Sequence, residues 1–148
     1  MTRTTKSRAG FTLIELLVVL VILGLLAALV APNVFRHLGA AKETTAKSQI
    51  EMLGAALDAY RLDTGRYPTA EQGLAALSQA PITEPRPANW RGPYLRKAVP
   101  LDPWGNAYLY HTLTPAAGAT TGDVELASLG ADAKPGGTGE DADVTLTR

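Results

Sequence analysis

Residues 10–15 read GFTLIE and open an apolar run that ends near Ala31. The 21 residues from 11 to 31 contain a single charged side chain, that of Glu15. At a rise of about 1.5 Å per residue, a helix of this length crosses a hydrocarbon core of roughly 30 Å. The sequence therefore predicts one transmembrane helix at residues 11–31.

Residues 1–10 form a short polar leader with three basic side chains, Arg3, Lys6 and Arg8, and no acidic one. Basic residues beside a membrane helix favour the cytoplasmic side. We therefore expect the leader in the cytoplasm and everything after Ala31 on the other side of the membrane.

Glu15 is the anomaly in this helix. A carboxylate at mid-bilayer costs roughly 2.5–3.5 kcal/mol, and less near an interface, so we expect it to have a cationic partner. The basic residues of the leader are one candidate. The other is the α-ammonium that Phe11 acquires if the chain is cut after Gly10. Because that ammonium cannot easily reach its own Glu15, it would pair with Glu15 of a neighbouring copy.

The residues favour a cut before the apolar run. Gly10 is small and flexible, which lets a protease approach the backbone. A secretory signal peptide is cut after its apolar region, at a small-x-small site. Here Leu29 occupies a position that should be small, and Pro32 follows directly. We therefore expect residues 1–10 to be removed and the apolar helix to be kept.

A basic leader, the GFTLIEL motif and a long apolar helix together resemble the N-terminal signal of type IV pilins and type II secretion pseudopilins. The resemblance implies that a prepilin peptidase cleaves after Gly10 and methylates the new amino terminus of Phe11. It also implies that Glu15, fifth in the mature chain, acts in assembly.

The composition limits the function classes. The 148 residues include 14 basic and 14 acidic side chains, and loss of the leader leaves 11 basic and 14 acidic. This mildly acidic balance argues against nucleic acid as a partner. The two histidines, His37 and His111, are far apart, and no catalytic motif is present, so we expect no enzyme. There is no cysteine to staple a thin core.

Residues 32–62 are predicted to form a stalk helix that packs on a globular domain. Ile50, Leu53, Leu57 and Tyr60 are spaced by three, four and three residues, which places them on one face of a helix. This face needs a partner surface, which the domain at residues 63–148 can supply.

Pro32 lies between the membrane helix and the stalk. A proline inside a helix removes a hydrogen bond and costs about 3 kcal/mol. It could kink the helix at the membrane exit, or the segment Gly24–Pro32 could melt when subunits pack into a fibre. The residues leave both readings open. The resemblance favours the second, because pilin helices can unwind here on assembly, and it gives Pro32 a role in assembly.

The second half of the chain is rich in turn residues and predicts a small α+β domain. The helix should end near Gly65. Thr69 and Gln72 form a capping box that begins a short helix. The predicted elements are a helix at about 70–79, an aromatic-pinned loop at 80–106 ending in a turn at 102–106, and strands at about 107–112 and 123–128.

Blocks in this domain narrow the resemblance to the major pseudopilin family of type II secretion. They are DTGRYPT at 63–69, EQGL at 71–74, LDPWGN at 101–106 and SLGAD at 128–132. The implied fold is type IV pilin-like: a long N-terminal helix, then a small domain with a short helix, a loop and a small antiparallel sheet. Adhesive type IV pilins usually close their last loop with a disulfide, which this chain cannot form.

Three carboxylates near the C-terminus, Asp132, Asp141 and Asp143, lie among glycines. Calcium binds six to eight oxygens from carboxylates and backbone carbonyls. Asp and Gly are also ordinary turn residues, and the spacing is not that of an EF-hand. The residues alone therefore leave a metal site and a set of solvated turns both open.

The resemblance implies a calcium ion in this loop. Its ligands would be Asp132, Asp141 and Asp143, with the backbone carbonyls of Leu129 and Lys134.

The loop departs from the family pattern at two places. Ala133 stands where a glycine is common, and residues 144–148 lack the usual Asn-Trp.

An ion that binds only the folded state stabilises it by about 2.7 kcal/mol at a hundredfold excess over Kd. Calcium would thus replace the missing disulfide.

Two classes of function fit the sequence. The resemblance implies a homopolymer, the major subunit of the type II secretion pseudopilus, which drives export of folded proteins across the outer membrane. Its implied partners are minor pseudopilins, an inner-membrane assembly platform and the prepilin peptidase. The protein would span the inner membrane once with a periplasmic domain, then enter a periplasmic fibre.

The alternatives are a type IV pilin of a surface fibre, and a membrane-anchored binding module that does not polymerise. The second alternative leaves Glu15 and the Gly10–Phe11 junction unexplained.

Overall fold

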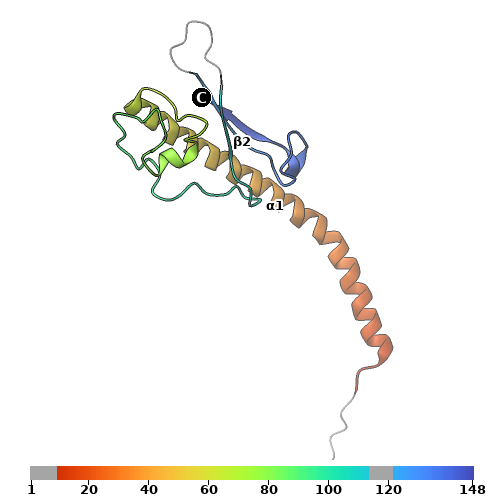
Figure 1. The fold of residues 1–148 in the computed structure, drawn as a ribbon. Coiled ribbons are helices and arrows are strands. Elements are labelled where there is room, and N and C mark those ends of the chain that lie inside the picture. Colours follow the sequence, from red (N-terminus) through yellow and green to blue (C-terminus); the bar gives the residue numbers. More distant parts are fainter. Residues whose placement is uncertain (1–9, 114–121) are drawn as a thin grey trace, which may run out of the picture. The chain divides into compact units, whose positions relative to one another are not determined.

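The computed structural model describes residues 10–113 and 122–148, and only the backbone of residues 30–37. The chain divides into two compact units, Met1–Leu38 and Gly39–Arg148. Figure 1 shows a long helix, irregular loops and a small sheet. The elements are α1 (Leu13–Thr64), the 3-10 helix η1 (Leu74–Leu77), strands β1 (Leu109–Thr112) and β2 (Val124–Ser128), the 3-10 helix η2 (Gly139–Asp141) and strand β3 (Val144–Thr147).

Helix α1 has 52 residues and includes the predicted stalk and most of the predicted membrane helix. Its backbone stays helical through Pro32, so unwinding on assembly remains a prediction. The predicted end of the helix is confirmed. Gly65 follows the last residue with φ of 80°, and its N–H donates to the carbonyl of Arg61 at 2.7 Å. Glycine suits this left-handed position because it has no Cβ.

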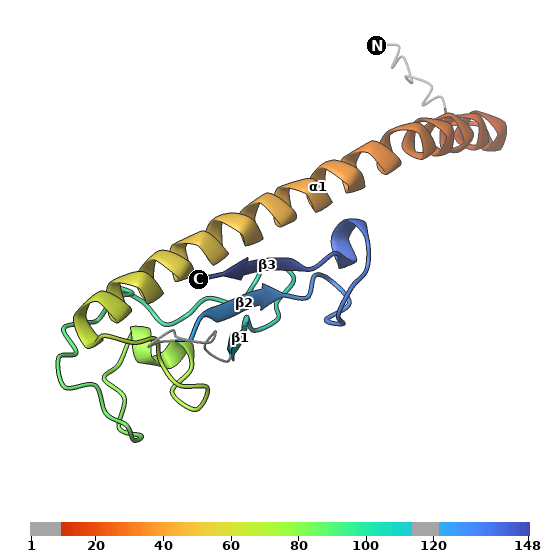
Figure 2. The ribbon, with the colours of Figure 1, turned by 90° about the horizontal axis from the view of Figure 1, so that it is seen from above.

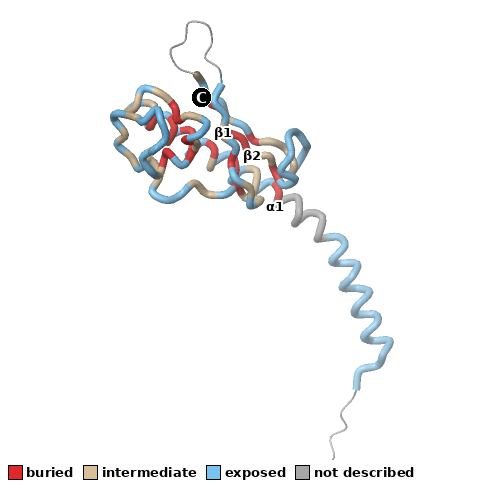
Figure 3. Tube along the Cα trace, viewed as in Figure 1, coloured by how far each residue is buried: buried red, intermediate tan, exposed pale blue. Residues whose placement is uncertain are grey.

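The predicted apolar face of the stalk is buried. Leu53, Leu57 and Tyr60 are fully buried, and Ile50 is 2% exposed. They share one core with residues of all three strands or their flanks, and with η1. Figure 3 shows that the buried residues gather in the globular unit. The domain after the stalk therefore supplies the partner surface that the helical spacing requires.

The sheet is antiparallel with the order β1-β2-β3. The first two strands lie within the predicted ranges, and residues 114–121 between them lie outside the described chain. The third strand, β3, was not predicted. Figure 2 shows β3 alongside the second half of α1. Val124 and Leu126 of the central strand and Val144 of β3 enter the core.

The capping box is confirmed, but the predicted helix at 70–79 is wrong in length and type. The Thr69 N–H donates to Gln72 Oε1 at 3.1 Å, and the Gln72 N–H donates to Thr69 Oγ1 at 3.2 Å. Only η1 follows, because Gly73 has φ of 53° and ends the first turn. The two leucines expected to be buried, Leu74 and Leu77, are buried.

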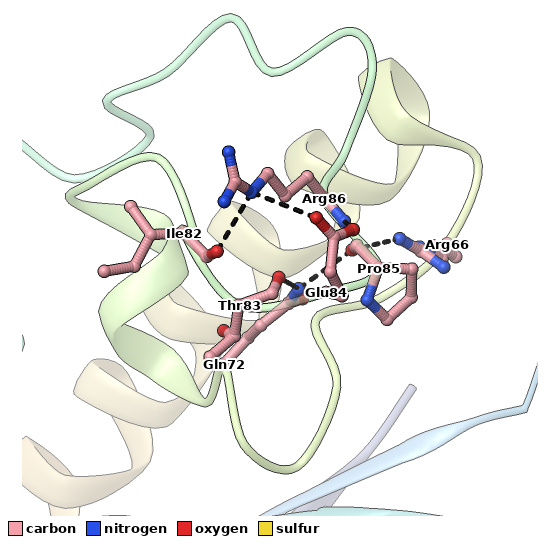
Figure 4. Close-up of polar contacts among 7 residues, drawn as sticks. All are labelled: Arg66, Gln72, Ile82, Thr83, Glu84, Pro85 and Arg86. Atoms are coloured by element: carbon pink, nitrogen blue, oxygen red, sulfur yellow. Dashed lines mark hydrogen bonds and ion pairs between the residues drawn. The ribbon is translucent and has the colours of Figure 1, made fainter.

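The buried amide of Gln72 also holds the next loop (Figure 4). Its Nε2 donates to the carbonyls of Thr83 and Pro85, both at 3.0 Å. Arg66 donates to the same Pro85 carbonyl. One amide thus satisfies two backbone carbonyls of a loop that forms no regular structure.

Aromatic side chains pin the rest of this loop, as predicted. Trp90 Nε1 donates to the carbonyl of Ala76 at 3.0 Å. The Tyr94 hydroxyl donates to Asp63 at 2.9 Å, and its ring packs edge-on against Tyr60 at 5.6 Å.

Candidate assembly and metal sites

Glu15 lies in the first turn of α1. Its N–H donates to the hydroxyl of Thr12 at 3.3 Å, so Thr12 caps the helix. A carboxylate in the first turn also faces the positive end of the helix dipole. Beyond the cationic partners expected in the leader or in a neighbouring copy, Glu15 thus has a local role that the prediction missed, although the Thr-x-x-Glu spacing at residues 12–15 is a capping signal.

Apart from Thr12, the surface around Glu15 is apolar. Each side chain of residues 11–29 is exposed, and Phe11 and Leu13 are 85% and 84% exposed. A groove beside Glu15 is lined by Phe11, Leu16, Val19 and Leu20. A helix that is hydrophobic all round belongs in a larger core or a membrane.

In the part of the chain that the structure describes, no helix has the length and hydropathy of a membrane span. The predicted span at residues 11–31 ends in two residues whose side chains lie outside that description.

The predicted cleavage residues lie just before α1. Gly10 and Phe11 are exposed and outside the helix. The preceding leader, residues 1–9, and the side chain of Pro32 lie outside the described residues. Cleavage, methylation and the assembly role of Pro32 therefore remain predictions.

The predicted calcium ligands all lie in the loop between β2 and β3. The Ala131 N–H donates to the carbonyl of Glu140 at 2.9 Å and closes the loop. The Lys134 N–H donates to Asp132 Oδ1 at 3.1 Å. The Gly136 N–H donates to Asp143 Oδ2 at 2.8 Å. Two of the three predicted carboxylates thus order the loop backbone.

Glycines let this loop fold tightly. Gly130 has φ of 68°, and a Cβ there would lie 2.7 Å from the Glu140 carbonyl oxygen. Gly137 has φ of 94°, and a Cβ there would collide with Asp141. The backbone of Asp141 is therefore held between two glycines that no larger residue can replace without a shift.

One oxygen in this loop suits a cation. Asp143 Oδ1 is buried and has no hydrogen-bond partner, and an unsatisfied buried acceptor is costly. Among the residues described, no group of three or more His, Cys, Asp or Glu side chains is placed to hold a metal ion. The chemistry of the loop, carboxylates and backbone carbonyls, is that of a calcium ligand set. The site itself remains a prediction.

Ala133 is the departure that the structure explains. Its φ is 54°, and among the described residues it is the one non-glycine with positive φ. The backbone here has the left-handed conformation that glycine adopts at little cost. The position therefore still requires what a glycine provides, and alanine is strained in it.

The turn at 102–106 holds the start of the loop. Asp102 is buried. Its Oδ1 accepts hydrogen bonds from the N–H groups of Trp104 and Asn106 at 3.1 and 2.7 Å. Its Oδ2 accepts one from the Ser128 hydroxyl at 2.6 Å. Asn106 Nδ2 donates to the carbonyl of Gly130 at 3.0 Å. The turn was predicted, but its contacts with Ser128 and Gly130 were missed.

The C-terminal residues 144–148, which depart from the family pattern, are held in place by Arg148. Its side chain lies over Gly54 of α1, where a Cβ would be 3.1 Å from Nε. Its guanidinium donates to Glu51 at 2.8 Å and forms an ion pair with Asp58 at 3.7 Å. The strand β3 is thereby held against the helix. No local pattern in the sequence predicts this contact, because Arg148 and its partners are far apart along the chain.

Two tyrosines at the sheet stay neutral at physiological pH. Burial, together with the nearby carboxylate of Asp102, raises the pKa of Tyr108 to about 12. Burial also raises the pKa of Tyr110, whose hydroxyl donates to the Pro68 carbonyl at 2.6 Å. Both act as hydrogen-bond donors within the fold.

Comparison with known proteins decides the family. A profile described as "Type II secretion system (T2SS), protein G" matches residues 33–147, and one described as "Prokaryotic N-terminal methylation motif" matches residues 5–31. This chain belongs to the type II secretion system protein G family.

Named members of this family are similar over most of their length. Type II secretion system core protein G of Pseudomonas aeruginosa is 50% identical over 139 residues, 94% of each chain. The Vibrio cholerae protein of the same name is 44% identical over 140 residues, 94% of this chain and 91% of the relative.

A solved structure agrees with this family and fold. The crystal structure of the major pseudopilin from the type 2 secretion system of enterohaemorrhagic Escherichia coli is 37% identical, with a TM-score of 0.57. The match covers 77% of this chain and 93% of that one. The predicted family and the type IV pilin-like α+β fold are confirmed. The chain is a pseudopilus subunit, a member of a family of structural proteins.

Proposed function

We propose that this pseudopilin is the major subunit of its fibre and polymerises through its N-terminal helix. The observation that carries the proposal is the helix surface from residue 13 to residue 29, which is aliphatic and exposed on all sides with Glu15 at its start. A single chain leaves this surface unmatched. Copies packed side by side would bury it, and the Phe11 ammonium of one copy would neutralise Glu15 of the next.

The chain would begin in the inner membrane and move from there into the fibre. Before assembly, residues 11–31 would anchor the chain in the inner membrane, with the globular unit in the periplasm. Prepilin peptidase would cut after Gly10, and an inner-membrane platform would feed the chain into a fibre with minor pseudopilins. The role is mechanical rather than catalytic: the fibre would push folded proteins through the outer membrane.

Calcium would act as a structural ion in this proposal. Asp132, Asp141 and Asp143, with the carbonyls of Leu129 and Lys134, would hold it. The buried, unpaired Asp143 Oδ1 supports this assignment. When bound, the ion would neutralise these carboxylates and stabilise a loop that has no disulfide.

The amino terminus of protein isolated from cells tests the proposal. Mass spectrometry should find a mature chain that starts at N-methylated Phe11. Filaments built from chains that retain residues 1–10 would overturn it, because the ammonium needed to neutralise Glu15 would then be absent.

A further inference from the structure

Glu140, in the C-terminal loop, contacts α1. It directly precedes Asp141 and is not one of the predicted calcium ligands. Its side chain lies on the backbone of Gly39, where an added Cβ would be 2.7 Å from Glu140 Cγ and 2.8 Å from Oε1. Gly39 is buried. An added Cβ at Gly39 would therefore displace the Glu140 side chain from this contact.

Glu140 also accepts two hydrogen bonds, one at its carboxylate and one at its backbone carbonyl. Its Oε2 accepts a hydrogen bond from Trp104 Nε1 at 3.4 Å. Its backbone carbonyl accepts the hydrogen bond from Ala131 that closes the loop. Glu140 thus joins the helix, the turn at 102–106 and the start of the loop.

We propose that Glu140 is a positioning residue, which couples calcium binding in the loop to the packing of that loop on α1 at Gly39. The inference rests on the proposed calcium site. Glu140 and Asp141 are adjacent, and the Glu140 carbonyl and the Asp141 backbone both lie against Gly130, so a shift of the Glu140 backbone would be transmitted to Asp141. Ligand atoms tolerate little displacement, so residues that orient them control metal affinity.

The coupling has a functional consequence. By linkage, calcium stabilises the loop–helix contact as much as the contact strengthens calcium binding. The bound ion would therefore hold the loop on the first helical turn of the globular unit, rather than order the loop alone.

The variant Gly39→Ala tests the coupling without altering any predicted ligand. We expect it to weaken calcium affinity roughly tenfold, measured by calorimetric titration of the full mature chain in detergent with calcium chloride. Gly24→Ala is the matched control, because it makes the same change on the same helix where nothing lies within 4 Å of the added Cβ. It should bind calcium as the wild type does.

Glu140 variants separate positioning from ligation. In a Glu140→Ala background, Gly39→Ala should have no further effect on affinity, since the side chain it displaces is gone. Glu140→Gln keeps the packing and an oxygen acceptor for Trp104, and should retain near-normal affinity. Loss of binding in Glu140→Gln would mean that the carboxylate ligates the ion, and would overturn the positioning role.

Two further outcomes are distinguishable. If the wild type does not bind calcium, the proposed metal site fails and the coupling fails with it. If the wild type binds and Gly39→Ala binds equally well, only the coupling fails. With a chelator present, Gly39→Ala should change the melting temperature little, because alanine favours the helix while it displaces the Glu140 side chain. A lower value would show a merely structural defect instead of the coupling.

Discussion

The two halves of α1 differ in how their apolar side chains are removed from water. In the first half, Leu25 is 69% exposed, and the exposed side chains around it are almost all aliphatic. In the second half, Leu57 is fully buried by its own domain, while Asp58 next to it is exposed. An all-apolar helix depends on lipid or other copies, whereas an amphipathic one is satisfied within its chain. The first half of α1 therefore leaves an apolar surface without a partner in its own chain, whereas the second half stabilises the globular unit.

The largest expected effect comes from Glu15→Leu. It should abolish fibres and secretion, because the neighbouring ammonium loses its partner. Membrane insertion should persist or improve, since a costly carboxylate is gone. Fibre yield, secretion and membrane fractionation measure the three effects. Glu71→Leu, an exposed acid in the globular unit, should leave assembly intact. Normal fibres in Glu15→Leu would contradict the role of Glu15.

The next effect compares leucines on the two halves of the helix. Leu57→Ala should lower the free energy of unfolding of the globular unit by about 2–5 kcal/mol, because it leaves a cavity. Leu25→Ala should change it by less than about 0.5 kcal/mol. Denaturation of the full chain in detergent, followed by tryptophan fluorescence, measures both. Equal losses would mean that the two halves are not independent in stability.

Removal of calcium should affect only the globular unit. Calcium at a hundredfold excess over its Kd would stabilise the globular unit by about 2.7 kcal/mol, so chelation should lower the melting temperature of this unit. Asp143→Asn should reduce this dependence, because Asp143 Oδ1 is a buried loop oxygen without a hydrogen-bond partner. A melting curve that chelation leaves unchanged would remove the metal site from the proposal.

A smaller effect should come from relieving strain in the loop. Ala133→Gly should raise the free energy of unfolding by about 0.5–1 kcal/mol, because φ of 54° disfavours alanine. Ala131→Gly, two residues earlier and without positive φ, should lower it by a similar amount. Urea denaturation distinguishes the two signs, and destabilisation by both would refute the strain.

The smallest effect appears only at high pH. The folded pKa of Tyr108 is raised to about 12 from a usual value of about 10. Between these values the folded state holds the proton more tightly, so stability is constant below pH 10 and falls as pH rises toward 12. Tyr108→Phe should make this fall shallower in urea denaturation at pH 9–12. Identical slopes would exclude this contribution.

Local patterns in the sequence predicted most of the fold. The spacing of Ile50, Leu53, Leu57 and Tyr60 gave the buried face, and Thr69 with Gln72 gave a reciprocal cap. These signals are local, because each depends on residues one or two helical turns apart. The predicted helix at 70–79 failed because Gly73 takes a left-handed conformation, which a propensity argument does not anticipate.

The missed contacts join residues distant in sequence. Arg148 binds Glu51, Asp102 binds Ser128, and Glu140 lies on Gly39. Spacing carries no signal for such pairs. Strand β3 was missed for a related reason: Val144–Thr147 alternates as a strand should, but it is short and was interpreted only as a departure from the family pattern.

The capped start of α1 has a consequence for maturation. The first helical residue is Leu13, and the cap is Thr12, so the bond between Gly10 and Phe11 lies outside the hydrogen-bonded turns. Breaking that bond costs the helix none of its backbone pairing. Cleavage would thus change only the charge at the N-terminus of an intact helix. It would remove three basic side chains and leave the ammonium of Phe11 beside the Thr12 cap.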